Sequence, residues 1–209
     1  SVQLSFSEGK QMHARLLQTV LGEDVIVNNA LLNMYGKCGN IEDAEKMFDN
    51  MIEGNSVSWN VLLSIYSDHG RSTLLVNEML CKGYMPDIIT WTSSLTSCAE
   101  ETNLAAGKRV HTCVNSRWPR IDSVVTTALI LLYGRCGDLE MARKMFLNLE
   151  ARTPVLWNAM IAVYAQHGLA GEALNTLNQM LIENIVSDEA TFTSILTACS
   201  HNGLLSEAC

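Results

Sequence analysis

Short polar side chains recur at nearly constant intervals along the chain, each close to the start of an apolar helical pattern. They are separated by 31, 32, 35, 31 and 35 residues and are Asn29, Asn60, Thr92, Thr127, Asn158 and Thr193. An Asn amide carries both a donor and an acceptor, so such positions could recognise the polar edge of a ligand. The sequence contains no GxSxG, no phosphate-binding glycine loop and no HExxH. We therefore expect recognition by hydrogen bonds, with no catalytic residue, no metal site and no cofactor.

Composition limits the kinds of protein that this chain can be. Apolar residues make up 48% of its 209 residues, which is ample for a core, and no segment reaches the roughly 18 uncharged apolar residues of a membrane helix. The net charge is −8, and five acidic residues but no Lys or Arg follow Arg152. This charge counts against nucleic acid as a partner, because phosphate contacts usually need a basic surface. The seven cysteines form no CxxC and indicate a reducing compartment.

Internal repetition is the strongest signal in the sequence. Residues 27–70 align with residues 125–168 at a constant offset of 98, which pairs Trp59 with Trp157. This interval is too long for one supersecondary unit, and the recurring Asn and Thr positions divide it into units of 31 to 35 residues. Each such unit contains two apolar helical stretches, so the sequence predicts an array of helical hairpins.

The unit at 25–55 illustrates how each hairpin should form. Gly39 suits the left-handed cap that ends the first helix, and Asn40 suits the N-cap of the second. The second helix carries an apolar stripe at i, i+3, i+4 and i+7, formed by Ala44, Met47, Phe48 and Met51. One hairpin cannot bury both of its faces, so neighbours must stack. We predict an all-α, right-handed superhelical solenoid of stacked antiparallel helix-turn-helix repeats.

Several motifs resemble pentatricopeptide repeats. They are Asn-Ala-Leu-x-x-Met-Tyr-Gly-Lys-Cys-Gly at 29–39, Ala44 with Met47-Phe48, Ser-x-Ser-Trp-Asn at 56–60, and Gly-Lys-x-x-His at 9–13. The alternating unit lengths resemble the plant subclass that mixes short, standard and long repeats. On this resemblance the chain divides into partial repeats at 1–24 and 189–209, short repeats at 25–55 and 123–153, standard repeats at 56–87 and 154–188, and a long repeat at 88–122. The second helix of the 56–87 repeat should be about one turn shorter than its counterpart.

The resemblance implies a binding function. In this family each repeat faces one base of a single-stranded RNA, and the fifth and last residues of the repeat contact the base edge. The corresponding pairs are Asn29 with Asn55, Asn60 with Asp87, Thr92 with Asp122, Thr127 with Thr153, and Asn158 with Asp188. Asn suits a pyrimidine, whereas the shorter Thr leaves space for a purine. The family's code then implies the core 5′-Y-U-G-N-U-3′, in which the pair Thr127 and Thr153 specifies no base.

Two further sets of residues follow from the same resemblance. The second residue of each repeat would sandwich the base, and these residues are Ile26, Val57, Ile89, Val124 and Val155. Basic residues near the end of the first helix of each short repeat would contact phosphates, and these are Lys37 and Arg135. The chain would then be the recognition segment of an RNA-editing or RNA-processing factor of mitochondria or chloroplasts, with editing-factor proteins as further partners.

Each of these positions also has a purely structural interpretation. An Asn or Thr near a helix start is commonly a cap, and the Asp at the end of a repeat could be a turn residue. The aliphatic second residues could belong to the core, and Lys37 and Arg135 could be solvated charges. Repetition explains His13 and His111 better than metal binding does. Packing anchors are expected at Trp59, Trp91 and Trp157.

Two other functions are open at this point. The acidic charge favours a protein-binding scaffold of tetratricopeptide type, although that family's Trp-x-x-Leu-Gly-x-x-Tyr pattern and uniform period of about 34 residues are absent. A deaminase supplied by a missing C-terminus or by a partner would make the chain its guide, although the HxE…PCxxC signature is absent here. The chain starts and stops inside repeats, so we expect a fragment whose uncapped ends associate or dimerise.

Overall fold

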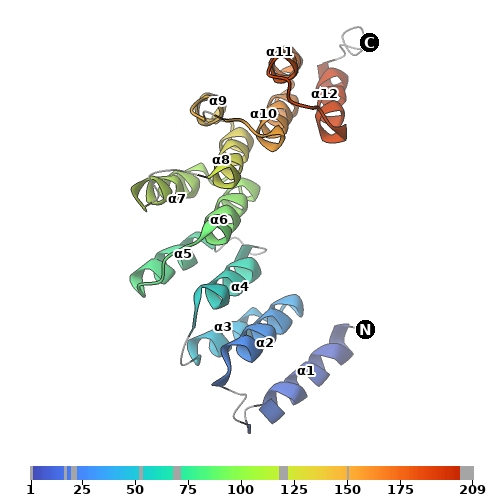
Figure 1. The fold of residues 1–209 in the computed structure, drawn as a ribbon. Helices are drawn as coiled ribbons and strands as arrows, with labels where there is room; N and C mark the ends of the chain where they lie inside the picture. Colours follow the sequence, from blue (N-terminus) through green and yellow to red (C-terminus); the bar gives the residue numbers. More distant parts are fainter. Residues whose placement is uncertain are drawn as a thin grey trace. The chain divides into compact units, whose positions relative to one another are not determined.

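The computed structural model describes residues 2–16, 18–19, 23–51, 54–67, 72–117, 122–149 and 151–202. The regular secondary structure of these residues is helical, with no strand (Figure 1). The helices are α1 (Val2–Leu16), α2 (Val25–Lys37), α3 (Ile41–Asp49), α4 (Ser56–Ser67), α5 (Ser72–Cys81), α6 (Ile88–Glu100), α7 (Leu104–Arg117), α8 (Ser123–Arg135), α9 (Leu139–Leu147), α10 (Pro154–Gln166), α11 (Ala170–Ile182) and α12 (Glu189–Asn202). The predicted all-α fold is therefore confirmed. None of the described helices is long and apolar enough to cross a bilayer.

Two compact units make up the chain, Ser1–Ser97 and Cys98–Cys209, and the boundary falls within α6. In the first unit, α2 packs against α3, its partner in the same predicted repeat, and against α4, the first helix of the next repeat. In the second unit, α10 packs against α11 and α12 in the same way. Each unit is thus held together by hairpin contacts and by contacts between successive first helices.

Capping determines where the two helices of the predicted repeat 25–55 end and begin. Helix α2 ends at Lys37, and Gly39 follows with a φ of 72°, in the left-handed region that a residue without Cβ adopts at little cost. The Asn40 side chain then accepts the backbone N–H of Asp43 at 3.1 Å and begins α3. The caps predicted at Gly39 and Asn40 are both confirmed.

Large aromatic side chains anchor the packing within each unit. Trp59, Trp91 and Trp157 are each 1% exposed, which confirms them as buried anchors. The ring of Trp59 meets Phe48 edge to face with centroids 4.6 Å apart, and Trp157 meets Phe146 in the same way at 4.8 Å. Such rings remove a large apolar area from water, so they contribute strongly to the packing energy.

Two glycines allow the first helices of neighbouring repeats to approach closely. A Cβ atom at Gly36 of α2 would lie 2.3 Å from Cγ1 of Ile65 in α4. A Cβ atom at Gly134 of α8 would lie 2.3 Å from Cγ2 of Val163 in α10. Nonbonded carbon atoms do not come this close, so any larger residue at either position would push the two helices apart.

The second helix of the predicted repeat 56–87 is short. Helix α5 contains 10 residues and its counterpart α11 contains 13, and the difference of three residues is nearly one turn. This agrees with the spacing in the sequence, although Arg71, where the shortened helix was expected to start, lies outside the described residues. A shorter helix buries less apolar surface, so we expect the hairpin of α4 and α5 to open more readily than that of α10 and α11.

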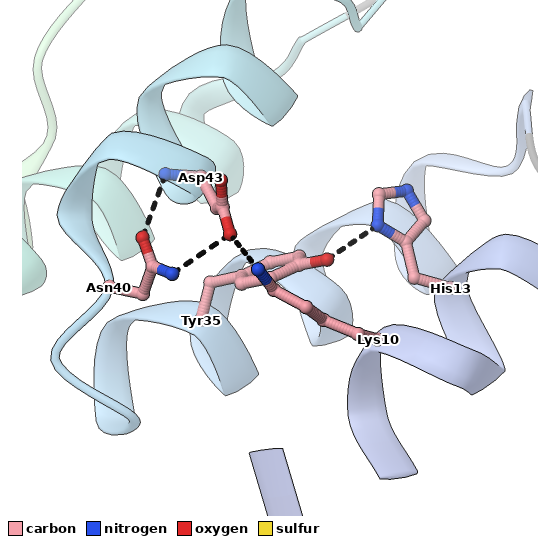
Figure 2. Close-up of polar contacts among 5 residues, drawn as sticks. All are labelled: Lys10, His13, Tyr35, Asn40 and Asp43. Atoms are coloured by element: carbon pink, nitrogen blue, oxygen red, sulfur yellow. Dashed lines mark hydrogen bonds and ion pairs between the residues drawn. The ribbon is translucent and has the colours of Figure 1, made fainter. Parts of the chain in front are cut away.

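A polar cluster joins α1, α2 and α3 (Figure 2). Lys10 of α1 forms an ion pair with Asp43 of α3 at 2.7 Å, and Nδ1 of His13 shares a hydrogen bond of 2.7 Å with the Tyr35 hydroxyl. Asn40 donates from Nδ2 to the same Asp43 carboxylate at 2.8 Å. The hydrogen bond to this carboxylate is the main reason that the pKa of Lys10 lies above its ordinary value, and it outweighs a lowering of the pKa by burial.

The second unit contains the same cluster with one exchange. His111 of α7 and Tyr133 of α8 share a hydrogen bond of 2.7 Å, and Lys108 forms an ion pair at 3.3 Å with Asp138. Asp138 is the N-cap of α9, whereas in the first unit the acid is the third residue of the helix, a position occupied here by Met141. The lysine therefore keeps an acidic partner although the acid has moved by three residues.

Acid should weaken the second unit through His111. This side chain is 7% exposed, its Nε2 is buried with no hydrogen-bond partner among the described residues, and burial lowers its pKa below 6.5. The unfolded chain therefore binds the proton more tightly than the folded chain does. The contribution of neutral His111 to the stability of the fold is full above pH 6.5 and is lost as the pH drops through the folded pKa. We expect the thermal midpoint of the wild-type chain to fall between pH 7.5 and 5 by more than that of His111→Gln. Equal losses would contradict this role.

Candidate functional site

The last residue of each predicted repeat lies immediately before a helix and occupies its N-cap. These residues are Asp24, Asn55, Asp87, Asp122, Thr153 and Asp188. Asp24 accepts the backbone N–H of Ile26 at 2.8 Å, and Asp122 accepts that of Val124 at 2.8 Å. Capping is therefore one role of this position, as the structural interpretation of the sequence allowed.

At Asp87 the cap extends to a third residue. Oδ1 of Asp87 accepts the backbone N–H of Thr90 at 2.8 Å, and the Thr90 hydroxyl accepts the backbone N–H of Asp87 at 3.1 Å. These reciprocal bonds form a capping box at the start of α6. Asp188 and Thr191 form the same box at the start of α12, at 3.0 and 3.1 Å.

The first of these boxes also holds the predicted base-reading Asn of its repeat. Asn60 of α4 donates from Nδ2 to Oδ2 of Asp87 at 2.9 Å, and its Oδ1 accepts the Thr90 hydroxyl at 2.7 Å. We call Asn60, Asp87 and Thr90 the first triad. Burial acts to raise the pKa of the Asp87 carboxyl, but hydrogen bonds from Thr90 and Asn60 outweigh it and hold this pKa below its ordinary value.

The second box holds its Asn in the same way. Asn158 of α10 donates from Nδ2 to Oδ1 of Asp188 at 2.9 Å, and its Oδ1 accepts the Thr191 hydroxyl at 2.6 Å. We call Asn158, Asp188 and Thr191 the second triad. Hydrogen bonds from the backbone and hydroxyl of Thr191, and then from Asn158, lower the pKa of Asp188. Both carboxylates are thus ionised at neutral pH, and two of the five predicted pairs are in direct contact.

The pair Asn29 and Asn55 is not joined by a hydrogen bond among the described residues. Asn55 caps α4 and accepts the backbone N–H and hydroxyl of Ser58, at 3.0 and 3.2 Å. No hydrogen bond joins Asn29 to either residue within the described part of the chain, and Oδ1 of Asn29 is buried without a partner. The capping box is therefore present at the end of the predicted repeat 25–55, but the bonds to the Asn that would complete a triad are absent among the described residues.

The predicted base-reading threonines bond to their own helices. The Thr92 hydroxyl donates to the carbonyl of Ile88 at 2.8 Å, and the Thr127 hydroxyl donates to the carbonyl of Ser123 at 2.8 Å. Thr153 occupies the N-cap of α10 and makes no side-chain capping bond. The hydroxyl hydrogens of Thr92 and Thr127 are thus used in bonds to backbone carbonyls, so these hydroxyls can only accept a hydrogen bond from a ligand.

The aliphatic second residues are on the surface. Between 54% and 80% of each residue is exposed at Ile26, Val57, Ile89, Val124 and Val155. Single exposed apolar residues are common, but here the same repeat position is exposed in five successive repeats. The alternative that these residues belong to the core is therefore wrong, and each is available to a ligand.

Lys37 and Arg135 lie at equivalent places. Each is an exposed residue in the last turn of its helix, where the helix dipole favours a positive charge. No ion pair engages either one within the described part of the chain. Other basic residues do form ion pairs with acids, and these are Lys10, Lys82, Lys108, Lys144 and Arg152. The two residues therefore present uncompensated charge.

No cluster of His, Cys, Asp and Glu able to hold a metal ion occurs among the described residues. Cys98 is buried, and burial raises the pKa of its thiol to about 11, so the thiolate is scarce at neutral pH. In each triad, by contrast, an Asn amide is hydrogen-bonded both to a carboxylate and to a hydroxyl.

Sequence reasoning missed Thr90 and Thr191. Both belong to an Asp-x-x-Thr pattern at the start of a predicted repeat, at 87–90 and 188–191. This spacing is typical of a capping box, and it could have been found by comparing the third residues of the repeats. The bond from each threonine to an Asn about 30 residues earlier could not, because it depends on how the two helices pack.

Family models match three parts of the chain. Residues 152–201 match a model described as PPR repeat family, and residues 29–56 and 124–152 match a model described as PPR repeat. A chloroplastic/mitochondrial pentatricopeptide repeat-containing protein of Arabidopsis thaliana is 36% identical over 97% of this chain and 33% of its own length. A second Arabidopsis thaliana pentatricopeptide repeat-containing protein is 34% identical over 96% of this chain and 33% of its own length. The chain thus spans about a third of these relatives.

Solved structures share the fold. The pentatricopeptide repeat protein PPR10 from maize superposes with a TM-score of 0.75 at 24% identity, over 99% of this chain and 32% of that one. PPR10 in complex with an 18-nt psaJ RNA element superposes with a TM-score of 0.78 at 20% identity, over 100% of this chain and 32% of that one. At these identities the likeness establishes the helical-repeat fold. Together with the family models and the relatives, it shows that this chain belongs to the pentatricopeptide repeat family.

Proposed function

We propose that this chain binds single-stranded RNA with one base per repeat, as the recognition segment of an RNA-editing or RNA-processing factor of mitochondria or chloroplasts. The observation that carries the proposal is the recurrence of the Asn–Asp–Thr triad. Each triad holds an Asn amide that still has one N–H and one oxygen lone pair to offer. The names of several relatives place them in chloroplasts or mitochondria, which supports the compartment.

The exposed aliphatic residues support the same function. A base inserted between two repeats can be held by apolar surfaces against both of its faces. Contacts with the faces of a base provide affinity that depends little on which base is bound. Val57 and Val155, each the second residue of a standard repeat, are 56% and 61% exposed. The uncompensated charges of Lys37 and Arg135 are suited to the phosphates between bases. PPR10, which shares this fold, was solved with a bound RNA element.

The base order 5′-Y-U-G-N-U-3′ belongs to the proposal, as does the division into short, standard and long repeats at 25–55, 56–87, 88–122, 123–153 and 154–188. For the long repeat, the Thr92 oxygen can only accept a hydrogen bond, because its hydrogen is bound to the Ile88 carbonyl. Guanine presents an N1–H donor on its Watson–Crick edge, so an accepting oxygen is compatible with G.

The test is a binding series on short unstructured RNAs that carry this core, with each base varied in turn. We expect Asn60→Thr to change the preference at the second base from U towards G, by on the order of 1–3 kcal/mol, and to leave the fifth base unchanged. Asn158→Thr is the matched control, which should change the fifth base only. An unchanged second-base preference in Asn60→Thr would refute the assignment of bases to repeats.

Salt dependence separates this function from a protein-binding scaffold. If Lys37 and Arg135 contact phosphates, RNA affinity must fall as salt rises, and Lys37→Gln with Arg135→Gln must flatten that dependence. Five repeats contact few bases, so modest affinity is expected from this segment alone. Absence of any RNA binding at low salt would instead favour the scaffold.

A further inference from the structure

Thr90 and Thr191 contribute to the triads without reaching the surface. Both residues are completely buried, with 0% exposure, at the third position of their helices. A buried hydroxyl cannot touch an RNA base. Any influence of Thr90 or Thr191 on recognition must therefore pass through the Asn that each one contacts.

The hydrogen-bond count at Thr90 assigns its single hydrogen. The hydroxyl oxygen already accepts the backbone N–H of Asp87 at 3.1 Å. Its hydrogen can go to Oδ1 of Asn60 at 2.7 Å or to Oδ1 of Asp87 at 2.9 Å. The shorter distance, and the two N–H donors that already bind the Asp87 carboxylate, favour Asn60 as the acceptor.

Thr191 shows the same order of distances. Its hydroxyl lies 2.6 Å from Oδ1 of Asn158 and 3.0 Å from Oδ1 of Asp188. The carbonyl end of each Asn amide thus faces a hydroxyl donor, while the NH2 end faces a carboxylate, which can only accept. A reversed amide would direct its oxygen at that carboxylate, which cannot donate, and would keep a bond to the threonine only if the hydroxyl turned its hydrogen from the Asn oxygen to the carboxylate. Asn60 and Asn158 therefore have one fixed amide orientation.

Amide orientation matters because the two pyrimidines have opposite hydrogen-bonding edges. Uracil presents an N3–H donor beside a carbonyl acceptor, whereas cytosine presents an N3 acceptor beside an amino donor at the same places. An amide that offers one acceptor and one donor in fixed order matches one of these edges and opposes the other. An amide that is free to reverse by rotation about its last side-chain bond matches both.

We propose that the hydroxyls of Thr90 and Thr191 determine specificity, by fixing the Asn amide in the orientation that accepts uracil and rejects cytosine. This inference rests on the proposed RNA-binding function and adds a third residue to each standard repeat. The threonines are positioning residues, since they act through Asn60 and Asn158. The long repeat has no such group, because the equivalent residue at the start of the following helix is Val125, which is completely buried.

The short repeat 25–55 provides an internal comparison. Its equivalent hydroxyl, on Ser58, lies 3.2 Å from Oδ1 of Asn55 and makes no hydrogen bond to Asn29. The buried Oδ1 of Asn29 has no hydrogen-bond partner among the described residues, so no hydroxyl holds this amide as Thr90 holds that of Asn60. The repeat that contains Asn29 should therefore accept uracil and cytosine about equally, whereas the two standard repeats should distinguish them.

The experiment measures the ratio of affinities for U and C at one base while the rest of the RNA core is constant. In the wild-type chain, U should be preferred over C about tenfold at the second and fifth bases. Thr90→Val keeps the shape of the side chain and removes the hydroxyl, and it should reduce this ratio to about twofold or less at the second base only. Thr90→Ser, which restores the hydroxyl, should return most of the ratio.

Two control variants make the outcome decisive. Thr191→Val should act at the fifth base and not at the second, and it replaces Thr90→Val if that variant fails to fold. Ser58→Ala should leave the ratio at the first base near one. A variant that weakens binding of U and C equally, with an unchanged ratio, would overturn the inference while the RNA-binding function stands. A wild-type chain that binds no RNA would overturn both.

Discussion

Replacing Trp157 with alanine is expected to destabilise the second unit by about 3–5 kcal/mol. The side chain is 1% exposed and fills the space between α9 and α10, where its ring meets Phe146 edge to face. The Arg152 guanidinium lies over both rings, 5.8 Å from the Trp157 centroid and 5.1 Å from that of Phe146. Alanine would leave a cavity and remove the stacking surface of the cation.

Val155→Ala is the matched control for this substitution. Val155 lies two residues earlier on the same helix and is 61% exposed, so its loss should change stability by no more than about 0.5 kcal/mol. Amide hydrogen exchange across α8 to α12, together with urea unfolding, measures both variants. If Val155 contacts a base, its variant should lose RNA affinity while keeping wild-type exchange. Similar exchange rates in Trp157→Ala and the wild type would show that the ring does not anchor these helices.

Gly134→Ala and Gly171→Ala should change stability in opposite directions. The added Cβ at Gly134 would lie 2.3 Å from Cγ2 and 3.1 Å from Cβ of Val163, so a rotation of that side chain cannot relieve the clash. We expect a loss of about 1–3 kcal/mol as α8 and α10 are forced apart. A Cβ at Gly171 of α11 meets no atom within 4 Å, and alanine there should stabilise the helix by about 0.5–1 kcal/mol.

A double variant tests the cause of the loss at Gly134. In Gly134→Ala with Val163→Ala, the two closest contacts, with Cγ1 and Cγ2, are removed and only the 3.1 Å approach to Cβ is left, so the two substitutions should be less damaging together than the sum of their separate effects. The free energy of unfolding of the four proteins gives this coupling directly. Additive effects would mean that the two helices can separate without cost, which contradicts close packing between α8 and α10.

Much of the fold could be predicted because local chemistry decides it. The apolar stripe of Ala44, Met47 and Phe48 is buried as its spacing indicates, and Gly39 has the left-handed conformation that its place in the sequence implies. These features depend on neighbours within about one helical turn, and a sequence shows such neighbours directly. The three buried tryptophans follow from size and apolar character in the same way.

The candidate site could be predicted only in part. The position of each Asn and Asp follows from the repeat, and the exposure of the aliphatic second residues is consistent with the proposed role. The contact of Asn60 with Thr90 could not be predicted, since the two residues are 30 positions apart and meet only because α4 packs beside α6. The acid that pairs with each lysine could not be predicted either. Asp43 lies in the first turn of α3 and Asp138 caps α9, and an acid is favourable at both kinds of position.

The last residue of each predicted repeat caps a helix, and this role limits which substitutions could be used to change base recognition. Every predicted repeat boundary in this chain is occupied by Asp, Asn or Thr, and these residue types favour the first turn of a helix. A lysine or a leucine introduced there to contact a new base would cost about 1 kcal/mol of helix stability at each junction. Over several junctions this loss would rival the stability of the whole array. The residue types that can be introduced at this position are therefore limited by helix capping, whichever base the new residue is meant to contact.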